Sequence, residues 1–189
     1  MHSSMIDFES DSRVEILSEQ ELRRTIARLA SQVLEKVSDS QALLLLGIPT
    51  RGVHLSKVLA KQLELIAGHS IAQGSIDPTF HRDDLLRIGT RMSQPTDIPS
   101  SIEDRSVVLV DDVIFTGRTV RASLEALQSW GRPRQVMLLV MVDRGHRELP
   151  IQPDFCGRQV PTRRTESIDL RLRDVDGEEG VFLCDSKKV

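Results

Sequence analysis

The sequence predicts an α/β fold in which helices flank a parallel β-sheet core and a small flap, or hood, is added to it. Three short apolar runs, Ala42–Ile48, Val107–Val110 and Val136–Val142, are typical of strands buried on both faces. Helical patterns separate these runs, and this alternation favours right-handed crossovers in a parallel sheet. Because ligands of such sheets bind beyond the carboxyl ends of the strands, we expect the site at the polar, glycine-containing turns that follow the runs. These turns cover residues 47–52, 111–119 and 143–147.

Apolar periodicity and capping residues predict the elements of the first half of the chain. Ser18 and Glu21 fit a capping box, and after them apolar residues recur every three or four positions, as on one face of a helix. The elements expected here are a helix from Ser18 to about Val37, a strand over Ala42–Ile48, a helix over Gly52–Ile66 that ends at Gly68, and a short strand over Ser75–Phe80, which Pro78 weakens.

The second half begins with a polar stretch, residues 81–104, which contains Gly89, Pro95 and Pro99 and has no apolar period. We expect a long loop there, and long loops inside compact domains tend to be functional. The elements expected after it are a strand over Val107–Val110, a helix over Thr119–Trp130, a strand over Val136–Val142, and shorter strand-like stretches over Phe155–Val160, Ile168–Val175 and Val181–Cys184. The first and last segments of the chain are expected to form the hood.

Length and composition predict one domain. The chain has 189 residues, and we expect a flexible leader over residues 1–13 and a single domain over residues 14–185. No apolar run approaches the length of a membrane span, and the polar N-terminus has no secretory signal, so a cytoplasmic location is expected. Cys156 and Cys184 lack the spacing of a zinc site and are interpreted as reduced, half-buried side chains. A net charge of -3 does not by itself indicate a nucleic-acid-binding protein.

The stretch Val107–Thr119, VVLVDDVIFTGRT, carries the clearest chemistry. Its apolar residues run directly into Asp111 and Asp112, which we place at the end of a strand, with the two carboxylates on opposite sides of the extended chain. The turn of residues 116–119, TGRT, then leads into a helix, where backbone N–H groups can bind an anion. Carboxylates for sugar hydroxyls beside an anion site indicate a ribose-phosphate site. The structural alternative is a strand–turn–helix whose Asp and Thr residues only cap the helix.

This stretch resembles the motif with which type I phosphoribosyltransferases bind 5-phosphoribosyl-1-pyrophosphate (PRPP), so the expected fold is like theirs. The resemblance implies that Asp111 and Asp112 contact the ribose, and that the 5-phosphate lies against Thr116, Gly117, Arg118 and Thr119, with Val113 beside them. It also implies a Mg²⁺ ion that is bound through the pyrophosphate, with Asp111 or Asp112 as a candidate protein ligand. Purine-salvage members carry an acid where this chain has Phe115, which argues against a purine substrate.

Other stretches resemble the PyrR-type proteins of this family, which are bifunctional pyrimidine-operon regulators and uracil phosphoribosyltransferases. Residues 142–151, VDRGHRELPI, resemble a signature of that group, and residues 161–166 and 80–85 resemble two further segments. The resemblance covers about residues 13–184 and implies a glycosyltransferase that converts uracil and PRPP into UMP and pyrophosphate, a reaction of pyrimidine salvage.

The same resemblance implies roles for further residues. Residues 47–52, GIPTRG, resemble the pyrophosphate-binding loop, which makes Arg51 a catalytic candidate with Thr50 and Gly52 beside it. A cation of the 81–104 loop, Arg82 or Arg91, is expected to stabilise the leaving group. Uracil is expected to be read by main-chain groups around Arg144 and Ile168. Surface placement of Arg51, or a local salt-bridge cluster around Arg144, is the alternative.

A regulatory role is the second hypothesis. Relatives of this type bind a leader RNA, in response to UMP or UTP, and attenuate transcription of pyrimidine genes. Five arginines between residues 144 and 164 supply positive charge for RNA phosphates, namely Arg144, Arg147, Arg158, Arg163 and Arg164. Against this, Gln152 stands where relatives often carry Arg, and Ala27 and Ser31 stand where some RNA-binding relatives carry Thr and His. We expect a homo-oligomer, a dimer or larger. The alternative function is a PRPP- or nucleotide-sensing, RNA-binding regulator with little catalytic turnover.

Overall fold

The computed structural model of the chain describes residues 13–83 and 94–185. Its elements, in chain order, are β1 (Arg13–Leu17), α1 (Glu19–Lys36), η1 (Ser40–Ala42), β2 (Leu43–Gly47), α2 (Arg51–Ala67), β3 (Ala72–Ser75), η2 (Thr79–His81), β4 (Ser106–Ile114), α4 (Arg118–Leu127), η3 (Gln128–Trp130), β5 (Gln135–Asp143), β6 (Phe155–Gln159), β7 (Glu166–Arg171), α5 (Arg173–Asp176) and β8 (Gly180–Asp185). The leader expected over residues 1–13 lies outside the described residues except for Arg13, which begins β1.

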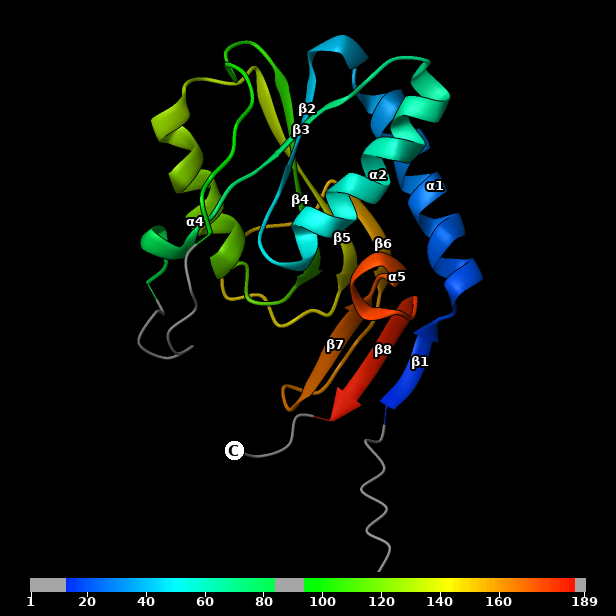
Figure 1. Cartoon of the computed structure of the whole chain (residues 1–189). Coiled ribbons are helices and arrows are strands. Elements are labelled where there is room, and N and C mark those ends of the chain that lie inside the picture. Colours follow the sequence, from blue (N-terminus) through cyan, green and yellow to red (C-terminus); the bar gives the residue numbers. More distant parts are fainter. Residues whose placement is uncertain (1–12, 84–93, 186–189) are drawn as a thin grey trace, which may run out of the picture.

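A five-stranded parallel sheet of order β3-β2-β4-β5-β6 forms the core, as predicted. Alternate residues of each central strand point to opposite faces. Leu43 and Leu45 of β2 pack with α1 and α2 on one face, whereas Leu44 and Leu46 pack with α4 on the other. Figure 1 shows the sheet between these two helical layers. Burial on both faces explains why these strands read as continuous apolar runs.

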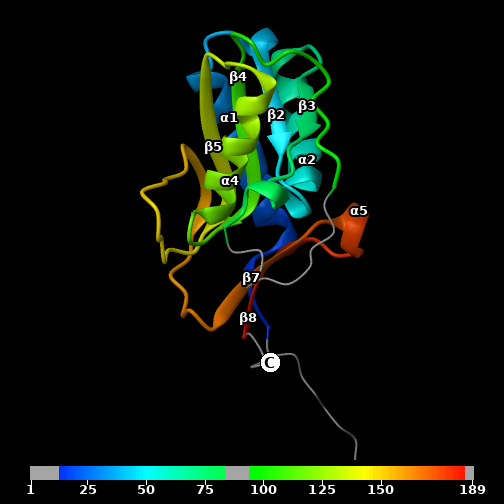
Figure 2. The same cartoon turned by 90° about the vertical axis from the view of Figure 1, so that its left-hand side faces the viewer.

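A second, antiparallel sheet of order β1-β8-β7 forms the predicted hood and carries the short helix α5. It joins the two ends of the described chain, since β1 is the first strand and β8 the last. Both views place this sheet beyond one end of the core (Figures 1 and 2). The expected strand Ile168–Val175 was too long, because Val175 belongs to α5, where the Asp176 carboxylate accepts a hydrogen bond from the Leu172 N–H at 2.8 Å.

The predicted strand Ser75–Phe80 was wrong in its position. The observed strand β3 ends at Ser75, which pairs with Gly47, the last residue of β2. Its partner β2 also ends at this point, and Pro78 instead leads into the turn η2. Phe80 is therefore 82% exposed rather than buried in a strand. The predicted helix Thr119–Trp130 is confirmed as α4, although its last turn is the 3-10 helix η3.

Two helix ends predicted from the sequence are confirmed, namely the start of α1 and the end of α2. Ser18 and Glu21 form the capping box ahead of α1, with Glu21 Oε2 accepting hydrogen bonds from the Ser18 N–H at 2.9 Å and the Ser18 hydroxyl at 2.7 Å. Helix α2 ends at Gly68, whose φ of 74° is the left-handed conformation of a C-cap.

Across the part of the chain that the structure describes, none of the helices has the length and apolar character that crossing a membrane requires.

Candidate active site

The acidic pair lies within a strand, not at its end as the sequence predicted. Strand β4 runs to Ile114, which pairs with Asp143 of β5. On its other side, the pairing with β2 stops at Val110. Residues 111–114 are thus held by β5 on one edge, while the other edge faces the space beyond the end of β2. A site at such a point of a parallel sheet is expected from the geometry of α/β folds.

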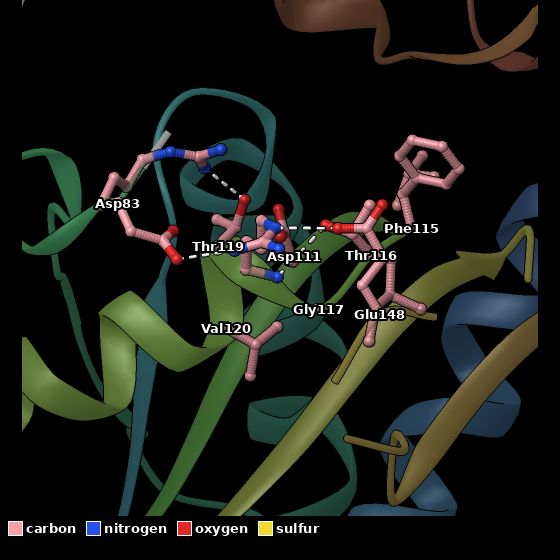
Figure 3. A pocket seen from close by; sticks show the side chains of 12 residues that line it. Asp83, Asp111, Phe115, Thr116, Gly117, Thr119, Val120 and Glu148 are labelled. Atoms are coloured by element: carbon pink, nitrogen blue, oxygen red, sulfur yellow. Dashed lines mark hydrogen bonds and ion pairs between the residues drawn. The ribbon is translucent and has the colours of Figure 1, made fainter. Parts of the chain in front are cut away.

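Two adjoining pockets occupy this space. The first, of about 500 Å³, is lined by Asp111 and residues 113–120, together with Arg82, Asp83 and Glu148. The second, of about 480 Å³, is lined by residues 49–51 and 111–113, Thr119 and Val175. They share Asp111, Val113 and Thr119, so the two pockets meet at Asp111. Figure 3 shows the residues that line the first pocket. Asp111 is 7% exposed, and Asp112 is half-buried in the second pocket only.

The first pocket ends on the turn before α4. Gly117 has a φ of 89° there, in the left-handed region that favours glycine, and helix α4 begins at the next residue. The Thr116 hydroxyl accepts a hydrogen bond from the Arg118 N–H at 3.3 Å. The first backbone N–H groups of a helix have no partner inside the helix and attract anions. The turn of residues 116–119 thus places the first N–H groups of α4 at the first pocket.

The second pocket ends on the turn before α2. The Pro49–Thr50 peptide bond is cis, and α2 begins at Arg51. Gly52 allows the first turn of α2 to approach β4, since a Cβ at that position would lie 2.3 Å from the Val110 carbonyl oxygen. A larger residue at position 52 would move the helix away from the sheet. The three predicted pyrophosphate-loop residues thus lie side by side against the strand that carries the acidic pair.

Arg51 is held by a hood residue that sequence reasoning missed. Its Nη1 and Nη2 atoms donate to the two Asp176 carboxylate oxygens at 2.7 and 2.6 Å. Burial alone would raise the pKa of Asp176, but the Leu172 N–H and the Arg51 guanidinium outweigh it and hold that pKa below its ordinary value. Asp176 belongs to the acidic segment of residues 174–185, whose ordinary interpretation is a solvated surface.

Arg82 lies at the first pocket, where its Nη1 atom donates to Thr119 Oγ1 at 2.5 Å. Arg118 forms ion pairs with Asp83 at 2.6 Å and Glu148 at 2.9 Å (Figure 3). Neither carboxylate was expected at the site, because Asp83 lies 35 and Glu148 lies 30 residues from Arg118 in the sequence. Arg91, the other cation expected from the 81–104 loop, lies outside the described residues.

The expected base-binding residues lie behind the first pocket. Arg144 does not line it, but its guanidinium carbon lies 4.1 Å from the centroid of the Phe115 ring, which does. Burial lowers the pKa of Arg144, which is 7% exposed and donates to the Thr162 hydroxyl and to the Arg163 carbonyl oxygen. Ile168 belongs to β7 of the hood and packs against the core instead of lining either pocket.

The carboxylates of the cleft suit a magnesium ion that is bound mainly by its substrate. Among residues 13–83 and 94–185 there is no group of three or more His, Cys, Asp or Glu side chains arranged to hold a metal. Mg²⁺ is commonly bound by one or two carboxylates together with phosphates and water, and not by an all-protein cage. Asp111 and Asp112, next to the second pocket, fit this pattern.

Comparison with known proteins agrees with this geometry. The family described as "Phosphoribosyl transferase domain" matches residues 12–164. A protein named "Bifunctional protein PyrR" from Picosynechococcus sp. is 51% identical over 172 residues, which cover 91% of this chain and 97% of the relative. A protein of the same name from Gloeothece citriformis is 54% identical over 170 residues, which cover 90% of this chain and 96% of the relative. A relative of the same name from Corynebacterium glutamicum is 46% identical over 175 residues, covering 90% and 91%.

Solved structures share the fold at lower identity. A hypoxanthine phosphoribosyltransferase from Staphylococcus aureus aligns with a TM-score of 0.70 at 19% identity, covering 98% of this chain and 97% of the other. The hypoxanthine phosphoribosyltransferase from Trypanosoma cruzi in complex with IMP aligns with a TM-score of 0.69 at 18% identity, covering 96% and 97%. The predicted phosphoribosyltransferase-like fold is confirmed, and the chain belongs to the phosphoribosyltransferase family and, within it, to the bifunctional PyrR proteins.

Proposed function

We propose that this chain is a uracil phosphoribosyltransferase, which makes UMP and pyrophosphate from uracil and PRPP, and that it also regulates pyrimidine genes through a leader RNA. The order of features along one cleft carries the proposal. An anion site at α4, a pair of carboxylates and an anion site at α2 follow one another, and they match the 5-phosphate, the ribose and the pyrophosphate of PRPP. The relatives named bifunctional support the double role.

Positioning and electrostatics account for the transfer. Breaking the bond at ribose C1 leaves positive charge on the sugar and negative charge on the pyrophosphate. Asp111 lies where the two pockets meet and Asp112 lines the second pocket beside it, which supports a role for this pair at the sugar hydroxyls and the electron-poor ribose. Thr50, Arg51 and Gly52 offer cationic and N–H groups to the leaving pyrophosphate. When bound, Mg²⁺ would neutralise part of the pyrophosphate charge, with Asp111 or Asp112 as its protein ligand.

The choice of base rests on Phe115 and the groups behind it. Phe115 cannot accept a proton, unlike the acid that purine-salvage members carry at this place, so a purine lacks a proton acceptor there. We propose that uracil lies against the Phe115 end of the first pocket, read by main-chain groups near Arg144 and Ile168. Arg144 stabilises this end, because its guanidinium stacks on the ring and donates to Thr162 and Arg163.

Only three of the five arginines expected to bind RNA are exposed. Arg147 is mostly buried, with 13% of its side chain exposed, and is paired with Asp143 at 2.5 Å; Arg144 is also buried. Arg158, Arg163 and Arg164 remain exposed. On α1, the exposed Arg28 donates to the Gly157 carbonyl oxygen at 2.6 Å and so lies beside the edge strand β6, which carries Arg158; the exposed surface of α1 and β6 thus holds both arginines. We propose that this surface binds RNA phosphates in a homo-oligomer located in the cytoplasm.

Two assays test these activities separately. Labelled uracil incubated with PRPP and Mg²⁺ is expected to give UMP, and an absence of turnover with any pyrimidine base would remove the enzyme claim in favour of a sensing protein. Retention of a pyrimidine-operon leader transcript, measured with and without UMP at physiological salt, is expected to depend on UMP. A transcript that binds equally weakly under both conditions would remove the regulatory role while leaving the enzyme intact.

A further inference from the structure

We propose that Arg82 binds the 5-phosphate of PRPP and UMP, and not the leaving pyrophosphate that sequence resemblance assigned to it. The inference rests on the proposed function, because it takes the first pocket as the 5-phosphate site. It adds a fifth residue to the four of the TGRT turn and makes the start of the 81–104 loop part of nucleotide binding. It also predicts that a ligand without pyrophosphate, such as UMP, is bound by the same cation.

The contacts of Arg82 carry the proposal. Its Nη1 atom donates to Thr119 Oγ1 at 2.5 Å, and Thr119 is the last residue of the TGRT turn (Figure 3). Arg82 lines the first pocket with Thr116 and Gly117. Arg82 is not among the described residues that line the second pocket, which holds Arg51 and Asp112. The guanidinium therefore lies in the first pocket, which contains the TGRT turn, and its partner Thr119 also borders the second pocket.

The backbone beside Arg82 is fixed to the same helix that forms the anion site. Arg121 of α4 donates to the His81 carbonyl oxygen at 2.7 Å. On the other side, the Asp83 carboxylate pairs with Arg118, the first residue of α4, at 2.6 Å. The residues before and after Arg82 are thus both bound to α4. A guanidinium held in this way loses less conformational freedom on binding a ligand than one on an unattached loop.

The charges of the pocket call for a second cation. Arg118 shares its guanidinium between the Asp83 and Glu148 carboxylates, so it does not by itself neutralise a phosphate dianion. Backbone N–H groups at the start of α4 supply partial positive charge but no full charge. Arg82, which also lines this pocket, adds a full charge, and its planar fork of donors matches two phosphate oxygens.

Binding measurements with two ligands separate the two roles. We would measure by calorimetry the dissociation constants of UMP and of inorganic pyrophosphate for the full chain and for Arg82→Gln and Arg82→Lys. Arg82→Gln is expected to weaken UMP binding by roughly 10- to 100-fold, as for the loss of charged hydrogen bonds, and to leave pyrophosphate binding unchanged. Arg82→Lys is expected to restore part of the UMP affinity, because it keeps the charge but not the bidentate fork.

Arg121→Gln is the matched control. It loosens the same backbone segment from α4, but Arg121 does not line the first pocket, so its UMP affinity is expected to change by less than about threefold. A UMP affinity that Arg82→Gln leaves unchanged, or that Arg121→Gln lowers as much, would overturn the inference. A wild-type chain that binds UMP but makes none from uracil would contradict the proposed turnover and leave this inference standing.

Discussion

Asp176 of the hood accepts two hydrogen bonds from the guanidinium of Arg51, the first residue of helix α2, at 2.6 and 2.7 Å. The Asp176 side chain is 6% exposed, so this pair is largely withdrawn from water on the carboxylate side. It links the antiparallel hood to the turn of the core that we propose binds pyrophosphate. The pair therefore couples the stability of the hood to the position of a proposed substrate-binding residue.

Loss of this pair is expected to destabilise the protein. Asp176→Asn and Arg51→Gln should each lower the free energy of unfolding by about 1–3 kcal/mol, because each leaves a charged partner without its hydrogen bonds. The double variant should lose less than the sum of the two single losses, since both remove the same interaction. Denaturant unfolding measures all three values. Asp174→Asn, an exposed change on the same helix, is the control, and full additivity would argue against the coupling.

The same carboxylate predicts how stability depends on pH. The pKa of Asp176 lies below its ordinary value of 3.8 in the folded chain, so in acid the unfolded state binds more protons than the folded state. Its stabilising contribution is complete above pH 3.8 and is lost as the pH falls through the folded-state pKa. Denaturant unfolding from about pH 5 down to pH 2.5 should show a smaller decrease for Asp176→Asn than for the wild type. Parallel curves would contradict the assignment.

Asp112→Asn tests the ribose role of the acidic pair. We expect kcat/KM for PRPP to fall by roughly 100-fold, because a charge that stabilises the transition state is lost. Asp112 is half-buried at the second pocket, and the substitution keeps its shape, so the unfolding temperature should stay close to that of the wild type. Steady-state kinetics with uracil and PRPP provide the measurement. A fully active variant would refute the role.

Gly52→Ala tests the close approach of α2 to β4. The added Cβ would lie 2.3 Å from the Val110 carbonyl oxygen, so the start of α2 must move. We expect a loss of about 1–3 kcal/mol of stability, as for overpacking, together with a higher KM for PRPP. Gly68→Ala at the other end of the helix meets no atom within 4 Å, and only its φ of 74° is unfavourable. That control should lose stability without a change in KM.

The stack of Arg144 on Phe115 predicts a selective effect on the base. Phe115→Leu removes the ring 4.1 Å from the guanidinium, a contact worth about 0.5–1 kcal/mol, so KM for uracil should rise about two- to fivefold. KM for PRPP should stay unchanged, since the TGRT turn and the acidic pair are intact. Phe115→Tyr keeps the aromatic face and should behave like the wild type. An equal rise in both KM values would place Phe115 with the phosphate site instead.

Several features could be predicted because they depend on neighbours in the sequence. The capping box of Ser18 and Glu21 lies within one turn of helix, and the TGRT turn needs only Gly117 to reach its left-handed φ. Strands buried on both faces leave continuous apolar runs, which is why β2, β4 and β5 were found. Strand ends were less accurate, because β4 continues through its acidic pair only where β5 supplies a partner.

By itself, the sequence determined the parallel core, the motif of residues 107–119 and the family, since these follow from local patterns of residues. Only the tertiary structure decided which distant groups meet. Asp176 reaches Arg51 across 125 residues, and Arg82 reaches Thr119 across 37, through the return of the hood and the attachment of η2 to α4. Ion pairs of this kind leave no periodic trace in a sequence, because their geometry depends on how separate elements pack. For that reason nothing in the sequence singled out Asp176 as a partner of Arg51, and resemblance assigned Arg82 to the pyrophosphate end of PRPP, whereas its contacts place it with the proposed 5-phosphate site.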